Sequence, residues 1–378
     1  MPKIKAVITN YDLITAYGRG ITPLWKGILS GQSRVDKLGR FPTPSFICHN
    51  AATVAGLNPM DQDSLVMQML KIILMGNTKI IPKDAWLILA TTVGEIDLLE
   101  KAVLKKTNSP KAGNLNLLLK KVSRLAKIKQ DGVLISCACA SSSTALAEAA
   151  RLIESGQKEC VLVVAADAVS EFVFSGFSAL MALDRNTAKP FDKNRAGLSL
   201  GEGAGFILLM SQARAKKEKR SILAQLCGWG LSCDANHMTG PSRNGEGLAQ
   251  AITCALKMAK IRPEKIGCIS SHGTGTLYND AMELSAFKKI FKNKPVPVYS
   301  IKGGTGHTLG AAGLIETIMA LKVQQEKIIP PTAGLTDPEP QACGWVSPSA
   351  KKLKHPTVIL NNCGFGGINA VLILKNLN

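Results

Sequence analysis

Short apolar runs alternate with longer amphipathic stretches along most of the chain. Several short runs are apolar throughout, which is typical of strands buried on both faces of a sheet. The pattern predicts strands at Ile4–Thr9, Trp86–Thr91, Gly132–Ser136, Cys160–Ala166, Gly205–Met210, Ile222–Leu231, Ile266–Ser271, Pro297–Ser300, Thr357–Asn361 and Asn369–Leu374. It predicts helices at Leu24–Ser30, Leu65–Met75, Thr144–Ile153, Gly247–Met258, Ala281–Phe291 and Ala311–Gln325. This alternation indicates an α/β fold with layers of helices on mostly parallel sheets.

The predicted elements follow in a similar order in two parts of the chain, residues 1–215 and 221–378. A charged stretch, Ala215–Arg220, separates them without a low-complexity linker. We therefore expect one compact unit made of two related halves. The segment Lys101–Gln130 does not follow the strand–helix alternation, and we interpret it as a cap or excursion that is mobile or packed on a partner.

Composition excludes several classes of protein. No run approaches 18 uninterrupted apolar residues, so no membrane span is expected. The N-terminal apolar stretch is too short and too polar for a signal peptide. Ten cysteines without regular spacing favour a reducing, cytoplasmic location over a disulfide framework. Cys137 and Cys139 form only a CxC pair and the other candidate ligands are scattered, so no metal site is predicted.

The formal net charge is +19, and it is unevenly distributed. Lys101–Gln130 holds nine lysines or arginines and no acidic residue. Such a surface attracts anionic partners, which include nucleic acid, anionic lipid and acidic protein. Aromatic residues make up only 5% of the chain and do not interleave with the basic runs, so nucleic-acid binding is not expected.

Cys139 lies where an apolar strand, ending near Ile135, gives way to the helix-forming run Thr144–Ile153. Backbone N–H groups and the positive end of a helix dipole favour thiolate over thiol at such a junction. Small neighbours leave room for a substrate. A lone cysteine is more often a buried structural residue. Three further motifs argue against that alternative here.

The second motif is Ile266–Asp280, which reads IGCISSHGTGTLYND. His272 follows a buried strand and enters a loop of alternating glycine and threonine. Thr274 and Thr276 place their hydroxyls on the same side of an extended segment. A histidine that only caps a strand is the alternative, but the GTGT sequence favours a ligand-binding loop.

The third motif, Tyr299–Gly313, reads YSIKGGTGHTLGAAG and brings Lys302 to a strand end and His307 to the start of a helix that contains Glu316. A nearby cation and carboxylate can hold buried histidines in one protonation state. The fourth motif, NNCGFGGIN, places Phe365 in a glycine-rich turn, where it is either a movable gate or a ring that fills the core.

Taken together, these motifs resemble one family. The resemblance also covers LWKGILSGQS, PFDKNRAGLSLGEGAG, DANHMTGP and IPPT, and it extends over nearly the whole chain. The chain is similar to the 3-oxoacyl-acyl-carrier-protein synthases of the type I/II group, which are condensing enzymes. The resemblance implies a thiolase-like α/β fold, with two related α/β halves in a layered α-β-α-β-α unit.

The resemblance also implies residue roles. Cys139 matches the nucleophile, and His272 and His307 match the two catalytic histidines. Lys302 matches the lysine beside them, and Glu316 matches its buried carboxylate neighbour. No metal ion is implied.

Other matched positions bind substrate. Thr274 and Thr276 match the threonines that contact the phosphopantetheine arm. Phe365 matches the gating aromatic, whose backbone N–H joins that of Cys139 in an oxyanion hole. His237 also matches the family pattern, and we interpret it as structural.

The implied reaction is a decarboxylating Claisen condensation of an acyl-enzyme thioester with malonyl-acyl carrier protein, in fatty acid or polyketide-type synthesis. The substrates are carried on phosphopantetheine, and no other cofactor is expected. The expected partners are an acidic acyl carrier protein and a second subunit, in a homodimer or a heterodimer with a related chain. The hypothesis for carrier docking names six basic residues, Lys71, Lys105, Lys106, Lys120, Lys121 and Arg124.

Two other functions remain open. A catalytically silent subunit that sets chain length resembles these enzymes but usually lacks the cysteine. A thiolase acting on coenzyme A esters usually pairs one histidine with a second cysteine, and Cys363 gives that alternative some support.

Overall fold

The computed structural model describes residues 4–104, 113–129, 132–292 and 294–377. Within these residues, eleven strands form one continuous sheet. They are β1 (Ala6–Thr15), β2 (Gly18–Arg19), β5 (Trp86–Ala90), β6 (Gly132–Ile135), β7 (Cys160–Asp167), β9 (Gly203–Ser211), β10 (Ala224–Cys233), β11 (Cys268–Ser270), β12 (Val298–Tyr299), β15 (Thr357–Gly364) and β16 (Ile368–Lys375). Two small sheets contain β3 (Asp36–Lys37), β4 (Asn50–Ala52) and β8 (Leu200–Gly201), and β13 (Ile328–Ile329) and β14 (Lys351–Lys352).

The large sheet repeats one topology. Outward from its middle, one half has the order β1-β9-β7-β5-β6 and the other has the order β10-β16-β15-β11-β12. In both halves the first two neighbouring pairs are antiparallel and the next two are parallel, so the expectation of mostly parallel pairing was wrong for the centre of the sheet. A short antiparallel pairing of β1 with β10, at Val7 and Ile8, joins the halves. The two related halves are therefore confirmed as a feature of the fold, although one sheet spans both.

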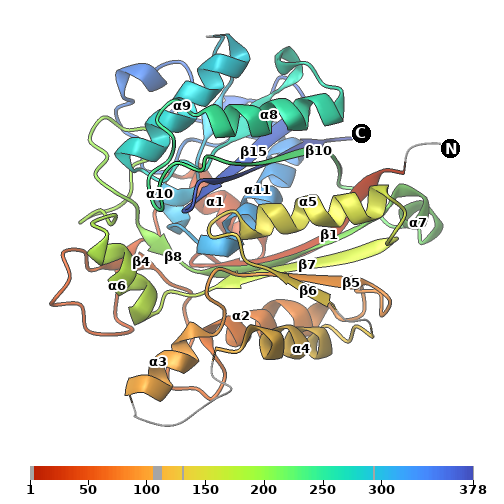
Figure 1. Ribbon diagram of the computed structural model, residues 1–378, viewed down its shortest axis with the longest axis horizontal. Helices are drawn as coiled ribbons and strands as arrows, with labels where there is room; N and C mark the ends of the chain where they lie inside the picture. Colours follow the sequence, from red (N-terminus) through yellow and green to blue (C-terminus); the bar gives the residue numbers. More distant parts are fainter. Residues whose placement is uncertain (1–3, 105–112, 130–131, 293, 378) are drawn as a thin grey trace.

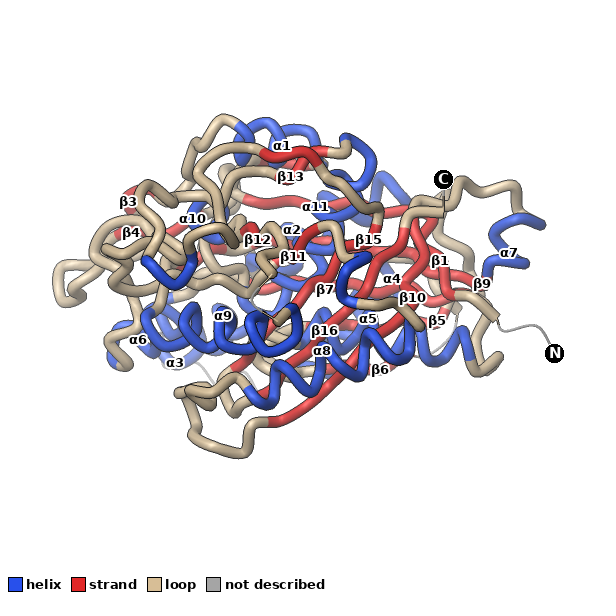
Figure 2. Tube along the Cα trace, turned by 90° about the horizontal axis from the view of Figure 1, so that it is seen from above, coloured by secondary structure: helices blue, strands red, loops and turns tan. Residues whose placement is uncertain are grey.

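Helices form three layers around this sheet (Figure 1). The middle layer is α5 (Ser141–Glu154) and α11 (Ala312–Glu326), and the outer layers are α8 (Glu246–Ala259) with α9 (Leu277–Phe291), and α2 (Leu65–Leu74) with α4 (Leu115–Leu125). From above, α8 lies over β10 and β16 with α9 beside it (Figure 2). The predicted layered α-β-α-β-α unit is thus confirmed.

Further helices of the described chain connect these layers. They are α1 (Ile21–Leu29), α3 (Ile96–Leu104), α6 (Glu171–Ala179), α7 (Gln212–Lys217) and α10 (Lys302–Thr305), with 3-10 turns η1 (Met75–Asn77), η2 (Pro263–Lys265), η3 (Leu309–Ala311) and η4 (Pro340–Ala342). Within the described residues, no helix combines the length and the apolar character needed to cross a bilayer.

The middle layer explains the composition of α11. Nearly all of its side chains are buried, because it packs against β15, β9 and α5 at once. A helix that is buried all round has no polar face. Close packing also requires a glycine on β9, since a Cβ at Gly205 would lie 2.6 Å from a methyl carbon of Leu314.

The segment Lys101–Gln130 differs from its prediction. Its described part is helical, and α4 packs on the protein's own α2, β5 and β6. Leu118 and Val122 face the core, whereas Lys120 and Arg124 are exposed. The interpretation as an excursion was therefore wrong for α4, whose apolar stripe was masked by its basic face. Residues 105–112 and 130 lie outside the described residues.

Candidate active site

A strained turn holds Cys139 between β6 and α5. Ala138 has a φ of 47°, a left-handed conformation that is costly for a residue with a Cβ. Its carbonyl oxygen accepts hydrogen bonds from the Ser141 hydroxyl at 2.6 Å and the Thr92 hydroxyl at 3.1 Å. These bonds fix the position of the thiol, which is only 6% exposed and faces a hollow.

The thiol itself differs from the sequence expectation. Burial raises the pKa of Cys139 to about 12, although the Lys302 charge and the Phe365 backbone N–H partly oppose this rise. The helix N-terminus was expected to favour thiolate over thiol, but here burial acts in the opposite direction and favours the thiol in the free protein. Because the thiol must lose its proton when it attacks, a neighbouring base has to accept that proton.

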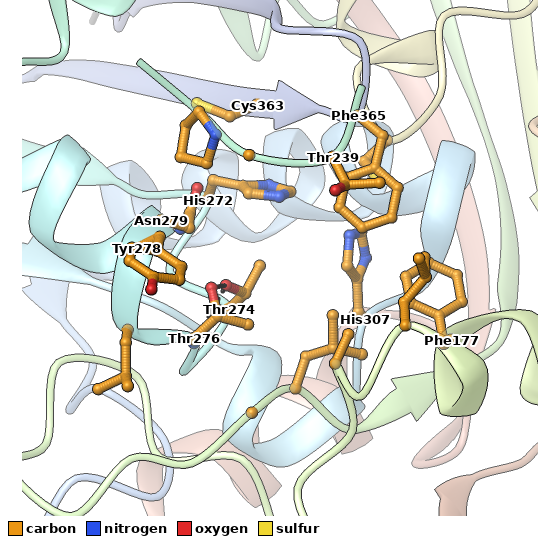
Figure 3. A pocket seen from close by; sticks show the side chains of 18 of the residues that line it. Phe177, Thr239, His272, Thr274, Thr276, Tyr278, Asn279, His307, Cys363 and Phe365 are labelled. Carbon is orange, nitrogen blue, oxygen red and sulfur yellow. Dashed lines mark hydrogen bonds between the residues drawn. The ribbon is translucent and has the colours of Figure 1, made fainter. Parts of the chain in front are cut away.

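Two histidines lie beside this thiol. His272 follows β11, His307 lies between α10 and η3, and their rings approach edge to face with centroids 5.1 Å apart. The ligand atoms of Cys139, His272 and His307 all lie within 4.8 Å of one another. Figure 3 shows both rings directed into the same hollow. This spacing would suit a metal ion as well as acyl chemistry, and the prediction of no metal stays a prediction.

Both imidazoles are neutral. Burial, followed by the Lys302 charge, holds the pKa of His272 and of His307 well below the usual range. His307 Nδ1 accepts a hydrogen bond from the Leu309 backbone N–H at 3.1 Å, so its proton is on Nε2. That Nε2 is buried and has no hydrogen-bond partner among the described residues. A donor without a partner is therefore available to a substrate oxygen.

Lys302 lies behind His272 and not in the hollow. Its ammonium group donates to the His272 carbonyl oxygen at 2.6 Å and to the buried Glu316 carboxylate. Glu316 in turn accepts a hydrogen bond from the Asn362 amide at 2.7 Å, and Asn362 pairs with Ser143. The chain of bonds links α10, α11, β15 and α5. Lys302 therefore contributes charge and position to the site.

Sequence reasoning missed the carboxylates on α9. Glu283 accepts hydrogen bonds from the backbone N–H groups of His272 and Gly273, at 2.8 and 2.7 Å. Asp280 accepts from the Thr274 N–H at 3.1 Å. Burial and the neighbouring Asp280 raise the pKa of Glu283 to about 7. The sequence did contain a clue to these residues, because Asp280 and Glu283 are two acids on an otherwise apolar helix face directly after the GTGT loop.

The hollow has a volume of about 410 Å³ and leads from solvent to the thiol and both histidines. Thr274 and Thr276 line it, and their hydroxyl oxygens are 2.9 Å apart. His237 lines its outer part, is exposed, and accepts hydrogen bonds from backbone N–H groups of its own turn. Among the described lining residues, none is a lysine, arginine, aspartate or glutamate. The wall is uncharged.

Phe365 stacks on Phe177, with centroids 5.6 Å apart and ring planes at 29° (Figure 3). Phe177 was not predicted, because nothing in its local sequence marks it. The backbone N–H groups of Phe365 and of Cys139 itself both lower the pKa of the thiol, so both act on the sulfur. A Cβ at Gly364 would lie 3.3 Å from the Cys139 nitrogen, so glycine lets this turn approach the nucleophile closely.

Comparison with known proteins is consistent with this geometry. The family model for the beta-ketoacyl synthase N-terminal domain matches residues 91–215, and that for the beta-ketoacyl synthase C-terminal domain matches residues 223–336. The 3-oxoacyl-[acyl-carrier-protein] synthase 2 of Coxiella burnetii is 30% identical, over 100% of both chains.

Two solved structures share the fold over 100% of both chains. One is the ishigamide ketosynthase/chain length factor, with a TM-score of 0.90 and 28% identity. The other is a type II polyketide synthase acyl-carrier protein in complex with its ketosynthase bound to the hexaketide, with a TM-score of 0.89 and 25% identity. The predicted thiolase-like fold is confirmed, and the chain belongs to the beta-ketoacyl synthase family.

Proposed function

We propose that this chain catalyses decarboxylating Claisen condensation of a Cys139-bound acyl group with malonyl-acyl carrier protein, giving 3-oxoacyl-acyl carrier protein. One observation carries the proposal. A thiol and two neutral imidazoles lie within 4.8 Å of one another at the inner end of an open hollow with uncharged walls. This set supplies a nucleophile and two hydrogen-bond donors at one point.

In the first step, the Cys139 sulfur attacks the carbonyl carbon of the acyl thioester. The thiol proton passes through a neighbouring histidine to the leaving pantetheine sulfur. The N–H groups of Cys139 and Phe365 stabilise the oxyanion, and loss of one such donor typically costs on the order of 100-fold in rate. The acyl group is then held on the enzyme while the first carrier leaves.

In the second step, the malonyl thioester carbonyl accepts hydrogen bonds from His272 and His307. Carbon dioxide leaves, and the electrons of the broken carbon–carbon bond form an enolate, which the two donors stabilise. The enolate then attacks the acyl carbonyl and expels the Cys139 thiolate. Uncharged walls favour this course, since no cation in the hollow stabilises the carboxylate that must be lost. Burial, with a smaller contribution from the Lys302 charge behind the wall, keeps both imidazoles neutral.

The substrate is carried on phosphopantetheine, whose arm contacts Thr274 and Thr276 along the hollow. The structure reduces the number of basic residues that are free to dock an acidic carrier. Lys71 pairs with Asp63 and Lys121 with Glu95, so these charges are partly used within the protein. Lys120 and Arg124 are exposed and make no ion pair with other described residues. Lys105 and Lys106 lie outside the described residues.

We infer further that the protein is a dimer, either a homodimer or a heterodimer with a related subunit. β6 is the outer strand of its half, pairs only with β5 among the described strands, and exposes 39% of Val133. The equivalent strand β12 is covered, since its Val298 N–H donates to the Trp345 carbonyl oxygen at 2.8 Å. Within the described chain, β6 therefore has a free strand edge, whereas β12 does not, and a second subunit can cover the edge of β6. The ten unbridged cysteines support a cytoplasmic location.

Acylation followed by mass spectrometry tests the function. Incubation with acyl-acyl carrier protein should give an adduct on Cys139, and malonyl-acyl carrier protein should then release carbon dioxide and remove the adduct. A protein that neither acylates nor decarboxylates would fit the silent chain-length subunit. Cys363 also lines the hollow, which supports a thiolase as the second candidate. Condensation of two acetyl-coenzyme A molecules without malonate would favour that candidate.

A further inference from the structure

A second hollow lies at the amino ends of the strands that carry the active site. Ile266 and Gly267, which precede β11, line it, together with Val296, which precedes β12, and His355, which precedes β15. The three strands are parallel. His272, Lys302 and Phe365 come after the carboxyl ends of β11, β12 and β15, respectively. Gly267, which lines the second hollow, and His272, which lines the first, lie five residues apart on either side of β11, roughly 17 Å of extended chain. The two hollows are therefore separate sites at opposite ends of the same strands.

The second hollow is strongly basic. Its lysines come from two segments that meet across the opening, and they are Lys292, Lys294, Lys351, Lys352 and Lys354. All five are exposed, and none forms an ion pair within the part of the chain that the structure describes. Glu264 is the one acidic residue among the described lining residues. Like charges held close together repel, so this cluster lowers stability unless an anion occupies it.

The shape and floor of the hollow narrow the class of anion. Its volume is about 750 Å³, within the range of sites for small organic molecules. Buried Ile266 and Phe291, with half-buried Ile290 and Val296, form an apolar floor beneath the lysines. Phe291 is buried in the floor, and no tyrosine or tryptophan is among the described lining residues, so the hollow lacks the row of exposed aromatic rings typical of single-stranded nucleic-acid sites. A concave site with a charged rim and an apolar floor suits a compact ligand with both properties.

We propose that this hollow binds a small organic polyphosphate, with its phosphates on the lysines and its organic body on the apolar floor. Lysine supplies point charges and not a planar fork, so the site recognises the number of negative charges more than their geometry. The ligand acts outside the reaction site, because the two hollows are at opposite ends of the strands. Neither the site nor its ligand depends on the condensation reaction.

Binding to the purified full-length protein tests this site, with ATP and inorganic tripolyphosphate as probes at physiological salt. The test variant combines Lys351→Gln, Lys352→Gln and Lys354→Gln. The matched control combines Lys216→Gln, Lys217→Gln and Lys219→Gln, which removes the same charge from another exposed cluster. ATP should raise the melting temperature of the parent and of the control, and the test variant should bind it at least about tenfold more weakly.

The apolar floor predicts that ATP binds more tightly than tripolyphosphate, although tripolyphosphate carries at least as much negative charge, because it has no organic body to contact the floor. Three results would overturn the proposal. They are equal loss of ATP binding in the two triple variants, tripolyphosphate binding as tightly as ATP, and no binding of either probe at millimolar concentration. Binding to vesicles of anionic phospholipid, lost in the test variant without any ATP binding, would also overturn it and point to a lipid surface.

Discussion

The two hollows at opposite ends of β11, β12 and β15 differ in whether their ionisable groups are buried and neutral or exposed and charged. At the carboxyl ends, the titratable groups are buried, the thiol and imidazoles are uncharged, and the single ammonium group is paired with Glu316 behind the wall. At the amino ends, five lysines stand exposed and unpaired within the described chain. The difference shows which end is built for bond making. Bond making needs neutral, fixed donors, whereas attraction of an anion needs free charge.

Removal of the nucleophile should have the largest effect at the carboxyl end. Cys139→Ala should lower condensation by about 10⁴-fold or more, because no other group can store the acyl chain. Acyl adducts should disappear from its mass spectrum. Cys137→Ala and Cys363→Ala are the matched controls, and both should still be acylated. Retention of an acyl adduct in Cys139→Ala would assign the nucleophile elsewhere.

Loss of either imidazole should cost about 10²- to 10³-fold in condensation, since each supplies one donor to the developing enolate. Malonyl-acyl carrier protein decarboxylation in His272→Ala and His307→Ala measures this directly. His237→Ala is the control, because His237 lines the outer hollow and bonds only to its own turn. An equal loss in the control would mean that the measured effect reflects the shape of the hollow.

The buried ion pair should matter for stability. Lys302→Met leaves the Glu316 carboxylate buried without its cation, and it should lower the free energy of unfolding by about 3 kcal/mol or more. Denaturant titration measures this change. The double variant Lys302→Met/Glu316→Leu should recover much of the loss, because no charge is then left unpaired. A double variant as unstable as the single one would contradict this account.

The pH dependence of thiol alkylation tests whether burial or the helix dipole controls Cys139. The raised pKa of about 12 means that the folded thiol holds its proton well above the pH at which an unfolded cysteine loses it. The iodoacetamide rate at Cys139 should therefore keep rising through pH 10 without a plateau. For the same reason, this group contributes stability below pH 9 that is lost as the pH rises toward 12. A plateau near pH 7 would favour the dipole.

Changes at the amino ends should have the smallest effect on the reaction. The variant with Lys351→Gln, Lys352→Gln and Lys354→Gln should condense at the parent rate and should melt at the same temperature or slightly higher. Steady-state kinetics and thermal unfolding of the two proteins measure this. A loss of condensation would show that the two ends of the strands are coupled.

The α/β layers and the residues around the thiol could be predicted from sequence for one physical reason. In a buried parallel sheet, continuous apolar runs mark strands, and the polar residues that follow each run collect at one edge. Cys139, His272 and Lys302 each follow such a run, so their approach to one another was expected.

Other features depend on contacts that no local pattern records. The pKa of Cys139 depends on burial by distant segments, which overcomes the helix N-terminus. Glu283 and Asn362 are polar residues within buried elements, and only the assembled fold shows what they bond. α4 was not predicted because its many basic residues obscure the helical spacing of its buried apolar residues. The lysines of the second hollow were counted only as surface charge, since the hollow exists only where the segments that precede β11 and β12 meet the segment that precedes β15.

The position of α11 has a consequence for how the protein is made. Residues 312–326 supply the shared core of both halves, including the side chain of Leu314 that packs on β9. During synthesis, β1, β7 and β9 are therefore complete long before the helix that covers them leaves the ribosome. Until α11 follows, the part of this sheet that α2 and α5 do not cover stays exposed in the growing chain, a condition that favours aggregation. A chain that stops before Ala312 lacks the core of its first half as well as its second.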